Sequence, residues 1–91
     1  MSTKLIAYDL NGPGQNYNDL ITAIKALGAW WHHLDSTWLV KSTLSTSQIR
    51  DRLKPYLDNN DEILVVNVTE DARSWSGFNE SGSKWLRDTW D

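Results

Sequence analysis

The spacing of apolar and polar residues along the chain predicts alternating strands and helices. Residues 4–10 are an almost continuous apolar run, which is typical of a central strand buried on both faces. Between Tyr17 and Leu27 the apolar residues recur at helical spacing, so we expect an amphipathic helix there. Asn16 or Asn18 can cap its start, and Gly28 is placed to end it. The chain therefore begins with a strand followed by a helix.

The next segment predicts a β-hairpin. Residues 29–34 and 37–41 are both rich in aromatic and β-branched residues, which favour an extended backbone. The link between them, Asp35-Ser36, has the length and polarity of a hairpin turn. We therefore expect two antiparallel strands joined at this turn.

A second helix and a last strand complete the pattern. Ser45 and Gln48 have the spacing of a capping box, which begins a helix. Pro55 lacks an amide hydrogen, so we expect it to shorten or kink the final turns of this helix. After a polar turn at 58–61, the apolar run 62–68 predicts the final strand.

The predicted order, β-α-β-β-α-β, indicates an α+β fold of the ferredoxin-like class, with one four-stranded antiparallel sheet and two helices on one face. The first and third strands should be central. We expect residues 1–69 to form this domain and residues 70–91 to form a C-terminal tail. A disordered tail is normally poor in aromatic residues. We therefore expect this tail to dock on the domain through its aromatic residues, Trp75, Phe78, Trp85 and Trp90. Residues 79–83 are small and turn-rich, whereas residues 84–90 could form one or two helical turns.

Composition narrows the possible functions. With 91 residues, a net charge of −3 and no cysteine, we expect a single domain without disulfides or thiolate metal sites. The acidic balance argues against a broad basic face for duplex DNA, because phosphate neutralisation supplies most nonspecific affinity.

No apolar stretch approaches the roughly 20 residues that span a bilayer, and no signal peptide is visible, so we expect a cytoplasmic protein without membrane contact. The six tryptophans exceed what so small a core can bury, so some should lie at an interface.

Asp9 is the first candidate for chemistry. It ends the first predicted strand and precedes the turn Asn11-Gly12-Pro13-Gly14, a place where small α+β domains often carry metal-binding or catalytic groups. A structural role explains the same residue, because an Asp before Asn-Gly commonly hydrogen-bonds to the turn backbone. The residues alone leave both interpretations open.

Histidine and tryptophan clusters have mainly structural interpretations. His32 and His33 are adjacent in a predicted strand and should point to opposite faces, so we do not expect them to chelate one ion. Trp30, Trp31 and Trp38 could stack nucleobases, but few basic residues accompany them. Packing in the core or at an interface is the favoured role of these tryptophans.

Several short motifs, in their order and spacing, resemble the small CRISPR-associated adaptation proteins of the Cas-two family. They are Tyr8-Asp9-Leu10-Asn11 at the end of the first strand and the stretch from Trp31 to Trp38 across the hairpin. The chain looks more similar to the SinR-like branch, where Trp-Trp-His, Ser-Thr-Trp and Leu-Lys-Pro-Tyr-Leu-Asp-Asn-Asn-Asp look like the shared pattern. The VapD-like toxins share this fold. The similarity covers roughly residues 4–69.

This resemblance implies a homodimer of ferredoxin-like units in which Asp9 is the metal-binding aspartate. In the relatives the two aspartates of a dimer face each other and bind a divalent metal, and some members are credited with metal-dependent cleavage of RNA or DNA. The implied cofactor is Mg²⁺ or Mn²⁺, since carboxylate oxygens suit hard cations. Asn11 and Ser36 are secondary catalytic candidates for orienting water or phosphate. The chain departs from the pattern at Leu39, where an acidic residue often follows the third-strand aromatic.

Two functions follow from these expectations. The first is a Cas-two-like dimer that acts as a divalent-metal-dependent endoribonuclease or endonuclease, or a degenerate descendant of one. The second is a noncatalytic dimeric interaction protein or nucleic-acid scaffold that uses the Trp-rich sheet face and the tail. The acidic charge and Leu39 weaken the first. Metal-dependent cleavage that disappears in Asp9→Ala would distinguish it from the second.

Overall fold

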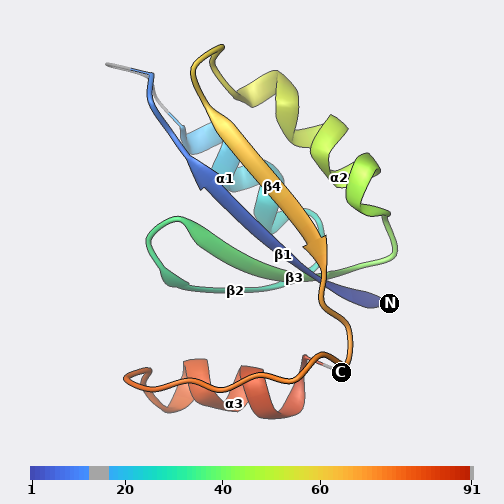
Figure 1. The fold of residues 1–91 in the computed structure, drawn as a ribbon, viewed down its shortest axis with the longest axis vertical. Helices are drawn as coiled ribbons and strands as arrows, with labels where there is room; N and C mark the ends of the chain where they lie inside the picture. The colour runs from blue at the N-terminus through green and yellow to red at the C-terminus, as the bar shows by residue number, and fades with distance from the viewer. Residues whose placement is uncertain (13–16, 91) are drawn as a thin grey trace.

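The computed structural model describes residues 1–12 and 17–90, which form one four-stranded sheet with helices on both faces (Figure 1). The expected turn at Pro13-Gly14 and the possible helix cap Asn16 lie outside the described residues. The architecture is α+β and is compatible with a ferredoxin-like fold. In chain order the elements are β1 (Ser2–Asp9), α1 (Asn18–Lys25), β2 (Ala29–Leu34), β3 (Thr37–Ser42), α2 (Thr46–Leu53), the 3-10 helix η1 (Lys54–Tyr56), β4 (Glu62–Asn67) and α3 (Glu80–Asp88).

The strands are ordered β2-β3-β1-β4, and all neighbours are antiparallel. The prediction that the first and third strands are central is confirmed. The register places Asp9 opposite Glu62 and Ala7 opposite Thr37. The end of β1, the start of β4 and the β2–β3 turn therefore meet at one end of the sheet.

Local sequence signals explain where the second helix begins and ends. Ser45 accepts a hydrogen bond from the Gln48 backbone, and the Gln48 side chain accepts one from the Ser45 backbone, so the predicted capping box is present. The α-helix ends at Leu53, and Pro55 lies in the 3-10 turn that follows, as its missing amide hydrogen predicts.

The first helix has a different start from the one expected. Its N-cap residue is Tyr17, which makes no side-chain capping hydrogen bond, so Asn18, one of the two residues expected to be able to cap it, does not do so. Asn18 is instead the first helical residue. The turn beyond the helix leads to Gly28, which has a φ of 154°, a conformation that glycine adopts without strain.

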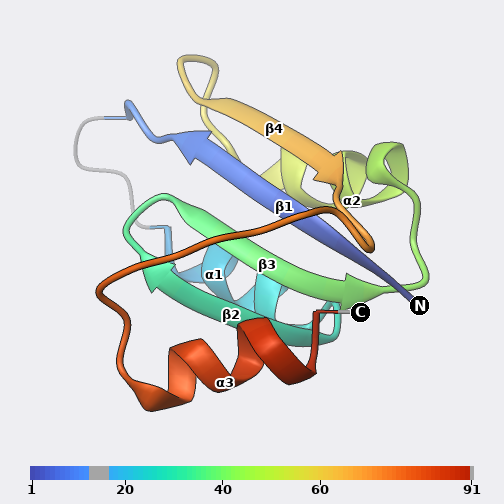
Figure 2. The same cartoon turned by 60° about the horizontal axis from the view of Figure 1, so that its bottom comes forward.

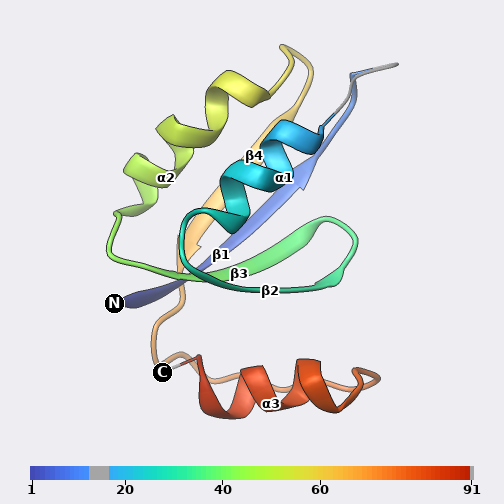
Figure 3. The ribbon, with the colours of Figure 1, turned by 180° about the vertical axis from the view of Figure 1, so that it is seen from behind.

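One face of the sheet carries the main core, beneath α1 and α2, which lie side by side (Figure 3). The even-numbered residues of β1 and β3 point into it, as the two-residue period of a strand requires. Its fully buried members include Trp38, whose indole nitrogen donates to the Tyr8 hydroxyl at 2.9 Å. The other buried residues of this core are Ile6, Leu20, Ile24, Val40, Ile49 and Leu53.

The tail covers part of the opposite face. After β4 the chain crosses the sheet as an extended strap, residues 70–79, and then returns as α3 beside β2 (Figure 2). Trp31 and Leu39 from the sheet pack against Leu86 and Trp90 from the tail, and all four are at least 93% buried. This second cluster holds the tail against the domain.

The tail helix is longer than expected from its sequence. Helical turns were predicted only at 84–90, because residues 79–83 are small and turn-forming. In the structure α3 begins at Glu80, and the Asn79 side chain accepts a hydrogen bond from the Gly82 backbone at 3.0 Å. A Cβ atom at Gly82 would lie 3.2 Å from ring carbons of His33. The glycine therefore lets α3 approach β2 closely.

Among residues 1–12 and 17–90, no helix is both long enough and apolar enough to cross a bilayer.

Candidate functional site

Asp9 lies at the exposed C-terminal end of β1, on the sheet face opposite α1 and α2. Its odd-numbered neighbours Leu5 and Ala7 point to the same face, and the tail reaches Leu5 but leaves the Asp9 end uncovered. A shallow hollow of about 330 Å³ surrounds Asp9 there. Its walls come from the end of β1, the β2–β3 turn and the start of β4.

Glu62 is the residue that sequence reasoning missed at this site. It is the direct cross-strand partner of Asp9, so the two carboxylates project from the same face of the sheet. Like charges in directly opposed positions destabilise an antiparallel pair. In the part of the chain that the structure describes, neither carboxylate forms an ion pair with a basic side chain. Two exposed like charges therefore stand in opposed positions at this end of the sheet, with no basic side chain of the described residues paired to either.

Ser36 lies beside this carboxylate pair. It occupies the β2–β3 turn, is exposed, and lines the same hollow as Asp9 and Glu62. Its backbone carbonyl accepts a hydrogen bond from the Tyr8 amide at 3.1 Å, which fixes the turn against the end of β1. The structure thus brings together two of the three residues that the sequence nominated.

Asn11 is not part of the hollow. Its side-chain nitrogen donates to the Asn60 carbonyl at 3.0 Å, and its backbone amide donates to the Asp61 carboxylate at 2.6 Å. These bonds tie the loop after β1 to the loop before β4. In this arrangement Asn11 holds the loop that follows Asp9.

Asp61 is the centre of this loop network. It accepts hydrogen bonds from the Asp58 amide at 2.7 Å, from the Asn11 amide and from the Tyr17 hydroxyl at 2.8 Å. Burial acts to raise the pKa of Asp61, but the hydrogen bonds from the backbone and from Tyr17 outweigh it and lower the pKa below its ordinary value. Burial first, and then the bond to Asp61, raise the pKa of Tyr17. The interaction therefore favours an ionised Asp61 and a neutral Tyr17.

The donor set at the hollow consists of hard oxygen atoms. Asp9 and Glu62 supply carboxylates, and Ser36 supplies a hydroxyl. Mg²⁺ is commonly held by one or two carboxylates and keeps several waters, so these donors fit a Mg²⁺ or Mn²⁺ ion. Within the described residues, no group of three or more His, Cys, Asp or Glu side chains is placed to hold a metal. One chain therefore provides a partial donor set.

The two histidines lie on opposite faces of the sheet, as predicted. The His32 ring stacks on Trp38 with ring centroids 3.7 Å apart and planes 5° apart. His33 packs against Trp31 and Phe78 on the tail side, with centroid distances of 5.2 and 6.0 Å. Both rings therefore fill packing positions.

The tryptophans divide between the interior and the surface. Trp31, Trp38 and Trp90 are buried, whereas Trp30 and Trp75 are 42% and 36% exposed. Much of the aromatic face expected to be available to partners is thus occupied by the chain's own tail.

In comparisons with known proteins, no family model matches the chain, and no solved structure gives a significant match. The functional argument consequently depends on the residues of the chain itself.

Proposed function

We propose that the chain is a ferredoxin-like homodimer that binds Mg²⁺ or Mn²⁺ through Asp9 and cleaves phosphodiester bonds in RNA or DNA. The strand order and the β-α-β-β-α-β sequence of elements support the ferredoxin-like assignment. The observation that carries the functional proposal is the opposed pair Asp9 and Glu62 on an exposed sheet face beside Ser36.

The carboxylate pair supports a metal site because two negative charges stand in directly opposed positions at an exposed strand end. Two opposed negative charges weaken the β1–β4 pairing. A divalent cation is the ligand that most directly neutralises two carboxylates.

A second copy would complete the donor set. Leu64 and Val66 stand on the same face as Asp9 and are 60% and 38% exposed. Apposition of this region in two chains would cover these apolar side chains and bring the two Asp9 residues together. The strap and α3 occupy the β2 side, which limits such a contact to the β1–β4 region.

Each residue at the site has a distinct role in this proposal. Asp9, with Glu62 beside it, would hold the ion, and the Ser36 hydroxyl would donate to a phosphate oxygen of the substrate. Asn11 and Asp61 would keep the loop after Asp9 in place through their hydrogen bonds. When bound, a divalent ion supplies positive charge for the phosphoryl oxygens and lowers the pKa of its water ligand.

Cleavage assays test this proposal. Labelled single-stranded RNA and duplex DNA are incubated with the purified chain in Mg²⁺, in Mn²⁺ and in chelator. We expect metal-dependent cleavage that Asp9→Ala abolishes and Glu62→Gln reduces. Asp35→Ala, which removes an exposed carboxylate next to Ser36, is the matched control and should retain activity. Absence of cleavage, or cleavage unchanged by Asp9→Ala, would refute the proposal.

A noncatalytic dimeric interaction protein is the second candidate. The net charge of −3 favours it, because an acidic chain gains little from phosphate contacts. The apolar side chains Leu64 and Val66 would then form the partner surface, and Asp9 and Glu62 would lie at its rim. In the assays above this candidate predicts no cleavage in any metal.

A further inference from the structure

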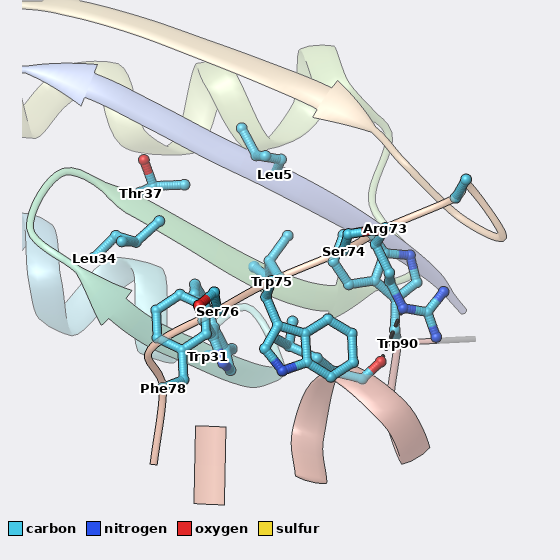
Figure 4. Close-up of a pocket in the computed structure, with 13 residues that line it drawn as sticks. Leu5, Trp31, Leu34, Thr37, Arg73, Ser74, Trp75, Ser76, Phe78 and Trp90 are labelled. Atoms are coloured by element: carbon cyan, nitrogen blue, oxygen red, sulfur yellow. Dashed lines mark hydrogen bonds between the residues drawn. The ribbon is translucent and has the colours of Figure 1, made fainter. Parts of the chain in front are cut away.

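A second hollow, of about 500 Å³, lies between the strap and the sheet (Figure 4). We call it the aromatic cleft. Leu5 and Leu39 come from the sheet beneath it, and Trp31, Phe78 and Trp90 provide aromatic walls. Trp75 projects from the strap that crosses in front.

The indole nitrogens around the cleft are already engaged within the protein. Trp31 donates to the Gly82 carbonyl at 3.1 Å, Trp75 to the Ser83 hydroxyl at 3.2 Å, and Trp90 to the Val68 carbonyl at 2.9 Å. Trp31 and Trp90 are also at least 93% buried, so Trp75, which is 36% exposed, and the half-buried Phe78 provide the ring surface that a ligand could contact. Recognition in the cleft would depend on apolar burial and ring stacking.

The charge of the cleft favours a neutral ligand. Arg73 is the charged side chain among its described lining residues. Its guanidinium lies over the Trp90 ring at 4.7 Å, and its Nε donates to the Leu86 carbonyl at 2.8 Å. The guanidinium is therefore used to hold the tail, and Ser74, Ser76 and Thr37 provide the remaining polar groups of the lining.

The strap determines what size of partner can enter. It runs across the face of the sheet in front of the cleft, so a partner helix would have to displace the strap to lie along the floor. The cleft volume, about 500 Å³, is within the usual range of roughly 300–1,000 Å³ for small-molecule sites. A small molecule fits these limits better than a second chain.

We propose that the aromatic cleft binds a small, neutral, planar aromatic molecule. The rings of Trp75 and Phe78 and the side chains of Leu5 and Leu34 would contact such a ligand, and the lining hydroxyls could satisfy one or two polar substituents. This site uses neither Asp9 nor Glu62 and is independent of the proposed cleavage.

A titration of the full-length chain with 2-naphthol tests the proposal, using the six tryptophan indole N–H signals in ¹⁵N-correlated NMR spectra. We expect saturable shifts of Trp31, Trp75 and Trp90, and little change at Trp30 and Trp38 on the other face. Cyclohexanol, which is neutral but not planar, should bind more weakly. Shifts that do not saturate, or that are equal for all tryptophans, would overturn the proposal.

Matched variants locate the site. Trp75→Ala should weaken 2-naphthol binding about fivefold or more, because one stacking surface is lost. Trp30→Ala removes another exposed tryptophan, outside the cleft, and should leave affinity unchanged. Leu34→Ala, within the cleft, should also weaken binding, whereas Leu64→Ala, an exposed leucine outside it, should not. Unchanged affinity in both Trp75→Ala and Leu34→Ala would contradict the assignment.

Discussion

The Tyr17 hydroxyl lies 2.8 Å from both carboxylate oxygens of Asp61 and joins the start of α1 to the loop that precedes β4. The same hydroxyl accepts a hydrogen bond from the Gly12 amide at 3.1 Å. These contacts support the loop after Asp9 from a segment far away in sequence. The geometry of the candidate site therefore depends on residues outside it.

Asp61→Asn should destabilise the protein at neutral pH, because an amide oxygen replaces a charged acceptor of several hydrogen bonds. The pKa of Asp61 is lowered in the folded state from its ordinary value of 3.8, so its contribution to stability is present above that ordinary pKa. That contribution is lost as the pH falls through the lower, folded-state pKa. Thermal melts from pH 7 down to pH 2 should show a melting-temperature difference that shrinks at the acidic end.

Asp88→Asn is the control for this titration. Lys84, through a hydrogen bond and its charge, lowers the pKa of Asp88, but the pair is exposed on α3 and should contribute little to stability. A larger loss in Asp88→Asn than in Asp61→Asn would contradict the role assigned to Asp61.

Leu86→Ala should lower the free energy of unfolding by about 2–5 kcal/mol, the usual cost of truncating a buried leucine. Leu86 is 4% exposed and packs with Trp31, Leu39 and Trp90 where the tail meets the sheet. Urea unfolding measures the change. The neighbouring exposed variant Arg87→Ala should change stability by less than about 1 kcal/mol. Equal effects of the two variants would mean that the tail does not contribute to the folded core.

Gly28→Ala should destabilise the turn before β2. A Cβ atom at Gly28 would lie 2.0 Å from the Lys41 carbonyl oxygen, so the backbone has to move in addition to bearing an unfavourable φ. Gly77→Ala is the matched control, because Gly77 also has a positive φ but has nothing within 4 Å of its Cβ position. Chemical denaturation should give a larger loss for Gly28→Ala, by about 1–3 kcal/mol. Similar losses of stability in the two variants would mean that the close contact with the Lys41 carbonyl does not contribute.

The proposed dimer predicts a mass of twice 10.5 kDa by light scattering at micromolar concentration. Leu64→Glu should convert it to the monomer, because the variant would place an unpaired charge in the contact between the two chains. Tyr56→Glu, at an exposed residue of η1, should remain dimeric. A parent chain of monomer mass would contradict the dimer.

The strands, the hairpin and the second helix could be predicted because their signals are local. The apolar run of β1, the Asp35-Ser36 turn, the Ser45 and Gln48 capping box and Pro55 each act over a few residues. The start of α3 could not be predicted in this way. Gly82 lowers the helix propensity of its segment, and its presence is explained only by the approach of His33 from a different element.

The candidate site was predictable only in part. Asp9 and Ser36 stand at a strand end and a turn, which are recognisable places for functional groups. Glu62 and Asp61 reach the site through the register of β1 with β4 and through loop hydrogen bonds, and no local pattern encodes either. No local pattern predicts the aromatic cleft either, because its walls come from the sheet, the strap and the end of the chain.

Mn²⁺ binding measured by isothermal titration calorimetry tests the central claim most directly, because it reports the site without requiring a known substrate. We expect saturable binding of one Mn²⁺ per two chains. Asp9→Asn should abolish it, and Asp35→Asn, which alters a nearby exposed carboxylate, should preserve it. Absence of saturable binding, one ion per chain, or binding that persists in Asp9→Asn would contradict a metal site formed by two Asp9 residues.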